Sequence, residues 1–160
     1  MAIIAIDPGT RNTGLVYMDE ARIIACKTIH FVKPCKNDQR EVMERALSIA
    51  TQVSNWLVDK PHEAVVIEGF LAYQKRQSAY TWQTPMLCGA LYNELKEDNV
   101  IVQTSAEVLN PARRGNMAAE KQALAEKKEI IADVEKLRND HLRSAATHGL
   151  YYYRRKNANK

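Results

Sequence analysis

The chain opens with a continuous apolar run that ends at a carboxylate and a turn. Residues 3–6 (IIAI) lead directly into Asp7, and Pro8 and Gly9 follow. An apolar run bounded by Pro and Gly is typical of a central strand that is covered on both faces. An Asp at the end of such a strand costs free energy unless a cation or several hydrogen-bond donors meet it. Asp7 therefore predicts a metal site or a phosphate site at one edge of a sheet.

The rest of the chain alternates between strand-like and helix-like patterns. We expect strands at 2–7, 14–19, 22–29, 64–67 and 100–102, the second and third of them joined as an antiparallel hairpin. We expect helices from Asn37 or Asp38 to about 59, at 78–97, at 118–137, and from Asn139 or Asp140 to 155, with a loop at 110–116. This order predicts one α/β domain over residues 1–160. Its mixed five-stranded sheet has three antiparallel strands and then two parallel strands, and helices flank it.

The composition of the chain indicates which cellular compartment and which binding partners to expect. The 160 residues are enough for one full hydrophobic core, and the formal net charge of +4 favours a polyanionic partner. The three cysteines have no CxxC spacing, which argues against a zinc site and against a disulfide framework. We find no signal-peptide pattern and no apolar run that could span a bilayer. We therefore expect a cytoplasmic protein without a membrane partner.

A second carboxylate, Glu68, ends the buried strand at 64–67. If this strand lies parallel to the first strand and beside it, Asp7 and Glu68 share one edge of the sheet. Two carboxylates this close repel each other unless a cation lies between them. Oxygen ligands suit Mg²⁺ or Mn²⁺. A pair of such ions, about 4 Å apart, can activate water and stabilise the leaving oxygen during phosphodiester hydrolysis.

Such a site needs a third source of ligands, and the start of the last helix is the best candidate. Asp140, His141 and Ser144 lie there within about one turn. Either Asp140 or His141 can share a helix face with Ser144, at spacings of four and three residues. Because Asp140 and His141 are adjacent, they cannot both point straight at one spot.

Three segments resemble, in the same order, the motifs of the RuvC family of Holliday-junction resolvases, which have an RNase H-like fold. Residues 3–14 resemble the first motif, residues 65–68 (VVIE) the second acidic strand, and residues 139–146 (NDHLRSAA) the start of the final helix. The resemblance covers nearly the whole chain. It implies a homodimer that cuts four-way DNA junctions with two Mg²⁺ or Mn²⁺ ions in each site. The small size suggests a phage or viral source, which would place the protein in the cytoplasm of a bacterial host.

One position departs from the family pattern. The final helix of the family carries Asp or His and, three residues later, Asp. If His141 matches the first position, Ser144 stands where the second carboxylate belongs; if Asp140 matches it, Arg143 stands there. We favour the pairing of His141 with Ser144, because Ser144 and Ala145 then align with the usual Asp-Ala. This chain is then an engineered inactive form, a natural variant in which Asp140 substitutes, or a protein that binds without cutting.

Further residues are candidates for DNA contact. Exposed aromatic side chains can stack on bases or wedge between them, and basic side chains can contact phosphates across the junction arms. The alternative for each is an ordinary loop or solvated surface residue. The candidates are Arg11, Phe70, Tyr73, Arg113, Arg114 and Lys121.

These observations lead to one main hypothesis. The protein is a structure-selective DNA endonuclease that resolves four-way junctions by paired, metal-dependent phosphodiester hydrolysis, with a catalytic set drawn from Asp7, Glu68, Asp140, His141 and Ser144. Asp7, Glu68, Asp140 and His141 are the candidate metal ligands. The alternatives are a junction-binding protein without cleavage and an RNase H-like nuclease for RNA–DNA hybrids. An actin-like or sugar-kinase-like ATPase is more remote, because that class needs two lobes and shows a second phosphate-binding hairpin.

Overall fold

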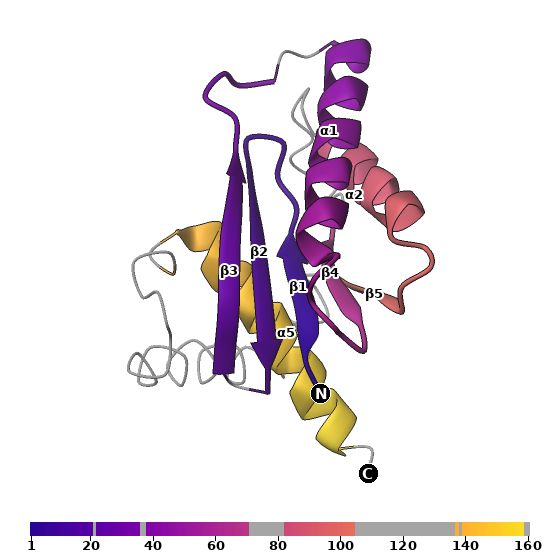
Figure 1. Ribbon diagram of the computed structural model, residues 1–160. Coiled ribbons are helices and arrows are strands. Elements are labelled where there is room, and N and C mark those ends of the chain that lie inside the picture. The colour runs from indigo at the N-terminus through magenta and orange to yellow at the C-terminus, as the bar shows by residue number, and fades with distance from the viewer. Residues whose placement is uncertain (21, 36–37, 71–81, 105–136, 138, 159–160) are drawn as a thin grey trace.

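The computed structural model describes residues 1–20, 22–35, 38–70, 82–104, 137 and 139–158. These residues form a five-stranded sheet with helices on both faces (Figure 1). Along the chain the elements are β1 (Ile3–Asp7), β2 (Asn12–Asp19), β3 (Arg22–His30), α1 (Gln39–Leu57), β4 (Val65–Gly69), α2 (Gln83–Glu94), β5 (Val100–Thr104) and α5 (Asp140–Ala158). None of the described helices is long and apolar enough to cross a membrane.

The strands lie in the order β3-β2-β1-β4-β5. β1 runs antiparallel to β2, and β2 runs antiparallel to β3, whereas β4 lies between β1 and β5 and runs parallel to both. The predicted mixed sheet, with three antiparallel strands and then two parallel strands, is confirmed. In the register of β1 and β4, Ile6 pairs with Ile67. The residues that follow this pair are Asp7 and Glu68, so the two carboxylates end neighbouring parallel strands.

Helices α1 and α2 cover one face of the sheet. Asp38 caps α1, because its Oδ1 accepts a hydrogen bond of 2.9 Å from the backbone N–H of Glu41. It is one of the two predicted caps, the other being Asn37. The apolar positions of α1 recur at helical spacing and pack against the sheet and α2. The largest buried side chains of this layer are Ile4, Ile6, Leu15, Ile49, Ile67, Leu87 and Leu91.

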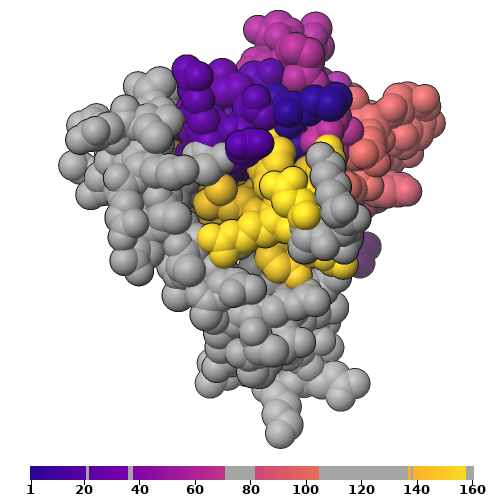
Figure 2. All heavy atoms as spheres, turned by 90° about the horizontal axis from the view of Figure 1, so that it is seen from below, coloured from indigo at the N-terminus to yellow at the C-terminus, as the bar shows by residue number. Residues whose placement is uncertain are grey.

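Helix α5 crosses the opposite face of the sheet (Figure 1). It packs closely because it presents small residues: a Cβ on Gly149 would collide with the sulfur of Met18. Near its C-terminal end, the Tyr153 hydroxyl lies 2.6 Å from the carbonyl oxygen of Met1 and 3.0 Å from that of Met18. Figure 2, which views the molecule from below, shows this part of α5 against the start of the chain. The start of the chain and the Tyr153 turn of α5 are thereby held against the sheet.

Some boundaries differ from those predicted. α2 begins at Gln83 rather than at 78, and residues 71–81 lie outside the described part of the chain. The loop predicted at 110–116 and nearly all of the helix predicted at 118–137 also lie outside it. α5 begins at Asp140 and continues to Ala158, three residues beyond the predicted end.

Candidate active site

The first pair of the candidate site joins β1 to α5. Side chains alternate along a strand, so Asp7 projects to the same face as Ile3 and Ala5, which is the face that α5 covers. There Asp7 Oδ2 lies 2.9 Å from His141 Nδ1. The Asp7 side chain is 15% exposed, so it is largely withdrawn from water. Asp7 and His141 thus form a charge-assisted contact between the end of a central strand and the first turn of a helix.

Two local features place His141 at this point. Asn139 caps α5, because its Oδ1 accepts a hydrogen bond of 2.9 Å from the backbone N–H of His141. Gly14, the register partner of Asp7 on β2, lies against the backbone of the same residue. A Cβ on Gly14 would sit 2.5 Å from the carbonyl carbon and oxygen of His141. Glycine at this position therefore permits the close approach that brings α5 to the carboxylate.

The second carboxylate, Glu68, has its own partners on α5. The hydroxyl of Ser144 donates a hydrogen bond of 2.8 Å to Glu68 Oε2. His148 Nε2 lies 3.5 Å from the same oxygen. On the other side of its ring, His148 Nδ1 lies 3.2 Å from Oε1 of Gln103, a residue of β5. A four-residue network therefore connects β4, β5 and α5 beside the Asp7–His141 pair.

His148 and Gln103 are not among the site residues predicted from the sequence. A signal for His148 was present in the spacing: residues 141, 144 and 148 stand at i, i+3 and i+7, which places them on one face of a helix. Gln103 had a weaker signal. It is a polar residue directly after the apolar run VIV of β5. Its register with Glu68 is known only from the structure.

The surroundings of Asp7 and His141 favour the protonated form of each side chain. Burial raises the pKa of Asp7 above its usual value, and the nearby Glu68 carboxylate adds to that rise, while the hydrogen bond with His141 opposes it. The pKa of His141 is also raised, chiefly by its hydrogen bond to Asp7. The pair therefore retains its protons to a higher pH than isolated side chains would.

Comparisons with known proteins agree with this architecture. No protein-family model and no curated protein matches the chain. Among solved structures, one of T. thermophilus RuvC in complex with a Holliday junction substrate matches with a TM-score of 0.70 and 22% identity, over 98% of this chain and 96% of that chain. The chain has the RNase H-like fold of RuvC.

Two further structures share this RuvC-like fold. A second Thermus thermophilus RuvC structure matches with a TM-score of 0.66 and 22% identity, over 98% of this chain and 97% of that chain. The yeast mitochondrial Holliday junction resolvase Ydc2 matches with a TM-score of 0.56 and 11% identity, over 92% of this chain and 74% of that chain. At these identities, the likeness establishes the fold, and the chemistry has to be argued from the side chains.

The side chains at this sheet edge match the ligand preferences of a divalent cation. Two carboxylates and an imidazole are ligand types that Mn²⁺ accepts, and the carboxylates also suit Mg²⁺. Within the described ranges, no group of three or more His, Cys, Asp or Glu side chains is already gathered around a common point. The carboxylates instead contact the α5 side chains. The residues fit a cation in chemistry, and Asp7, Glu68 and His141 are the ones that would hold it.

The other predicted site residues lie in several places. The Asp140 side chain is 96% exposed and lies 3.6 Å from Arg143 Nη1, so it faces solvent rather than Asp7. Arg11 is exposed in the turn between β1 and β2. Phe70, which follows β4 directly, is 39% exposed. Four predicted DNA contacts lie outside the described residues, namely Tyr73, Arg113, Arg114 and Lys121.

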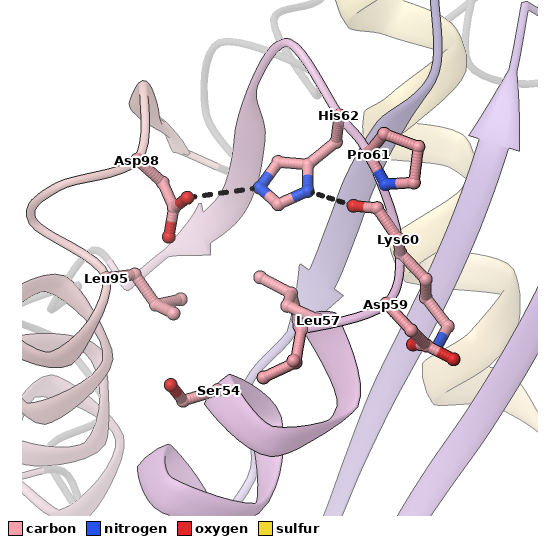
Figure 3. Close-up of a pocket in the computed structure, with 9 residues that line it drawn as sticks. Ser54, Leu57, Asp59, Lys60, Pro61, His62, Leu95 and Asp98 are labelled. Atoms are coloured by element: carbon pink, nitrogen blue, oxygen red, sulfur yellow. Dashed lines mark hydrogen bonds and ion pairs between the residues drawn. The ribbon is translucent and has the colours of Figure 1, made fainter.

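A separate open pocket of about 580 Å³ lies where α1 and α2 end (Figure 3). His62 occupies its rim, with Nδ1 2.6 Å from the carbonyl oxygen of Lys60 and Nε2 3.3 Å from Asp98 Oδ1. Leu57 and Leu95 contribute apolar lining. His62 precedes β4 and Asp98 precedes β5, so the pocket borders the edge of the sheet where these strands begin. Asp7 and Glu68 lie where strands end, at the opposite edge.

Proposed function

We propose that this protein is a structure-selective DNA endonuclease that cuts four-way junctions by metal-dependent phosphodiester hydrolysis. The observation that carries the proposal is the placement of Asp7 and Glu68 at the ends of neighbouring parallel strands, both facing α5. Two carboxylates at one sheet edge are the arrangement that binds the cations of phosphodiester hydrolysis. The shared fold supports the substrate class, because one RuvC structure with this fold holds a Holliday junction.

The residues of this chain take distinct roles in the proposal. Asp7 and Glu68 would hold one or two Mg²⁺ or Mn²⁺ ions, while His141 orients Asp7 and, in its neutral form, would contribute a nitrogen ligand. A bound ion supplies an activated water and stabilises the negative charge that develops on the leaving oxygen. The partial burial of Asp7 keeps bulk water away and strengthens these interactions. Asp140 is not needed for this set, because it faces solvent.

Junction recognition rests on shape and phosphate contacts. A four-way junction has two equivalent strands to cut, so a homodimer with two sites matches its symmetry. Arg11 and Phe70 are the described candidates for contact with the DNA, since both are exposed and lie close in sequence to Asp7 and Glu68. Tyr73, Arg113, Arg114 and Lys121 complete the proposed contact set. The net charge of +4 favours such a polyanionic partner.

A second candidate function is junction binding without cleavage. The observation that favours it is Ser144, which hydrogen-bonds Glu68 at a position where the family resemblance places a carboxylate. Serine is neutral and is a weak ligand for Mg²⁺ compared with a carboxylate. A site with one carboxylate fewer binds its cations less tightly, and DNA binding through basic residues does not depend on that loss.

One experiment separates these functions. End-labelled four-way junction, linear duplex and RNA–DNA hybrid are incubated with the protein in Mg²⁺, in Mn²⁺ or in EDTA, and binding is measured in parallel by gel shift. We expect tight binding of the junction over duplex, and paired nicks in the junction only with a cation. Junction binding without nicks in either cation supports the second candidate. Preferential cleavage of the hybrid, or no preference for the junction, overturns the proposal.

A further inference from the structure

The imidazole of His148 is buried on α5, one helical turn beyond Ser144 and next to the proposed site. His148 is 1% exposed, and its neighbour Gln103 is 3% exposed. Polar groups at this depth cost free energy unless hydrogen bonds replace their contacts with water. The surrounding α5 positions Ala145 and Ala146 are small and apolar. We therefore expect His148 and Gln103 to contact a polar neighbour, and not only to fill space in the core.

That neighbour is Glu68. The His148 ring lies between a side chain of β4 and one of β5, with Nε2 3.5 Å from Glu68 Oε2 and Nδ1 3.2 Å from Gln103 Oε1. Glu68 and Gln103 are register partners on β4 and β5, so both contacts originate from one level of the sheet. Ser144 Oγ also contacts Glu68 Oε2, at 2.8 Å. Two side chains of α5 thus act on the same carboxylate oxygen.

The position of the proton on His148 follows from these contacts. A lone pair on Nε2 directed at a carboxylate oxygen would be repulsive, whereas an N–H there is attractive. The Gln103 amide is compatible with an N–H at Nε2. In a neutral imidazole, Nδ1 is then unprotonated and accepts a hydrogen bond from the Gln103 NH₂, because the amide oxygen and nitrogen can exchange places. His148 then presents Nε2–H to Glu68.

We infer that His148 is a positioning residue, which together with Ser144 holds the Glu68 carboxylate in one orientation at the site. Two donors on one oxygen restrict rotation of the carboxylate, and such outer contacts tune how well a carboxylate binds a cation. This inference rests on the proposed function, because that function makes Glu68 a ligand of a cation. The contact between His148 and Glu68 can be tested without any cation.

The first test determines whether Nε2 of His148 carries a proton in the metal-free protein. Long-range ¹H–¹⁵N NMR of the histidine rings distinguishes a protonated Nε2 from one that carries a lone pair. We expect His148 to show a protonated Nε2 whose ring proton exchanges slowly with water, and we expect its signals to shift in Glu68→Gln. An Nε2 without a proton overturns the inference, as does a His148 spectrum that Glu68→Gln leaves unchanged.

The second test measures the consequence for Glu68 by Mn²⁺ titration without DNA, using calorimetry or the EPR signal of free Mn²⁺. We expect His148→Leu to weaken Mn²⁺ binding by about 10- to 100-fold, the usual effect of losing an outer-shell partner. His148→Gln retains an N–H donor of similar reach and is expected to keep most of the affinity. Thr147→Val is the matched control, because Thr147 is also buried on α5 but hydrogen-bonds the carbonyl oxygen of Arg143. It should bind Mn²⁺ as the wild type does.

The outcomes separate this inference from the proposed function. If the wild type binds Mn²⁺ and His148→Leu binds it equally well while remaining folded by circular dichroism, the positioning role is wrong and the metal site stands. If the wild type binds no Mn²⁺, the proposed metal chemistry fails. The NMR measurement still decides whether His148 donates to Glu68. Equal losses in His148→Leu, His148→Gln and Thr147→Val mean a packing effect, which also overturns the inference.

Discussion

His141 Nδ1 lies 2.9 Å from Asp7 Oδ2, which joins residues 134 positions apart in the chain. The contact fixes the first turn of α5 against the end of β1. It also holds a carboxylate that burial would otherwise make costly. A cation that enters this site has to be bound by a carboxylate that already has a partner. The properties of this pair therefore affect both stability and metal binding.

The stability of the metal-free protein should fall as the pH rises through the titration of His141. The folded-state pKa of His141 is raised above its ordinary value of 6.5, so the stabilisation is fully present below about pH 6.5 and is lost as pH rises through the folded-state pKa. The raised pKa of Asp7 acts in the same direction at lower pH. Urea unfolding in EDTA, from about pH 6 to pH 8, should show this decline in the wild type and a shallower one in His141→Gln. Identical pH dependence in the two proteins would show that the pair contributes nothing.

The substitution Gly14→Ala should push α5 away from the sheet. Its Cβ would lie 2.5 Å from the backbone of His141, and backbone cannot move aside as a flexible side chain can. We expect the free energy of unfolding to fall by about 1–3 kcal/mol. Gly89→Ala, in α2, is the control, because a Cβ there meets nothing within 4 Å. It should stabilise the protein by about 0.5–1 kcal/mol. Equal effects in urea unfolding would mean that α5 does not approach β2 as described.

Ser144→Asp should make the protein more dependent on a cation. The change removes the hydrogen bond to Glu68 and places a second negative charge beside it, so we expect a loss of about 1 kcal/mol in EDTA. Mn²⁺ should restore more stability to this variant than to the wild type, and junction cleavage should rise. Ser144→Asn, similar in size but neutral, should show neither gain. A thermal shift in Mn²⁺ that is the same for both variants would argue against a cation next to Glu68.

The sheet and its carboxylates were predictable because they depend on local patterns. The apolar run before Asp7 and the similar run before Glu68 identify two buried strands, and parallel neighbours necessarily share the edge where their strands end. A cap at Asn37 or Asp38 was also predictable, because Asn or Asp directly before an apolar-periodic run is a local signal, and the structure has the cap at Asp38.

The choice between Asp140 and His141 was not predictable from local rules alone. The two residues are only one position apart on α5, and the cap at Asn139 and the close approach at Gly14 together set the rotation of the helix. His148 was missed for a related reason. A lone histidine in a helix is ambiguous until the strands that face it are known, and its contacts come from β4 and β5.

Cleavage of a four-way junction by the wild type and by Asp7→Asn, in Mg²⁺ and in Mn²⁺, tests the central claim most directly. Asn keeps the size of Asp7 but lacks the charge that binds a cation. We predict that Asp7→Asn lowers the rate of paired nicking by at least about 100-fold, as expected for loss of a positioned catalytic group, while gel shift shows junction binding unchanged. Nicking by Asp7→Asn at the rate of the wild type would contradict the account.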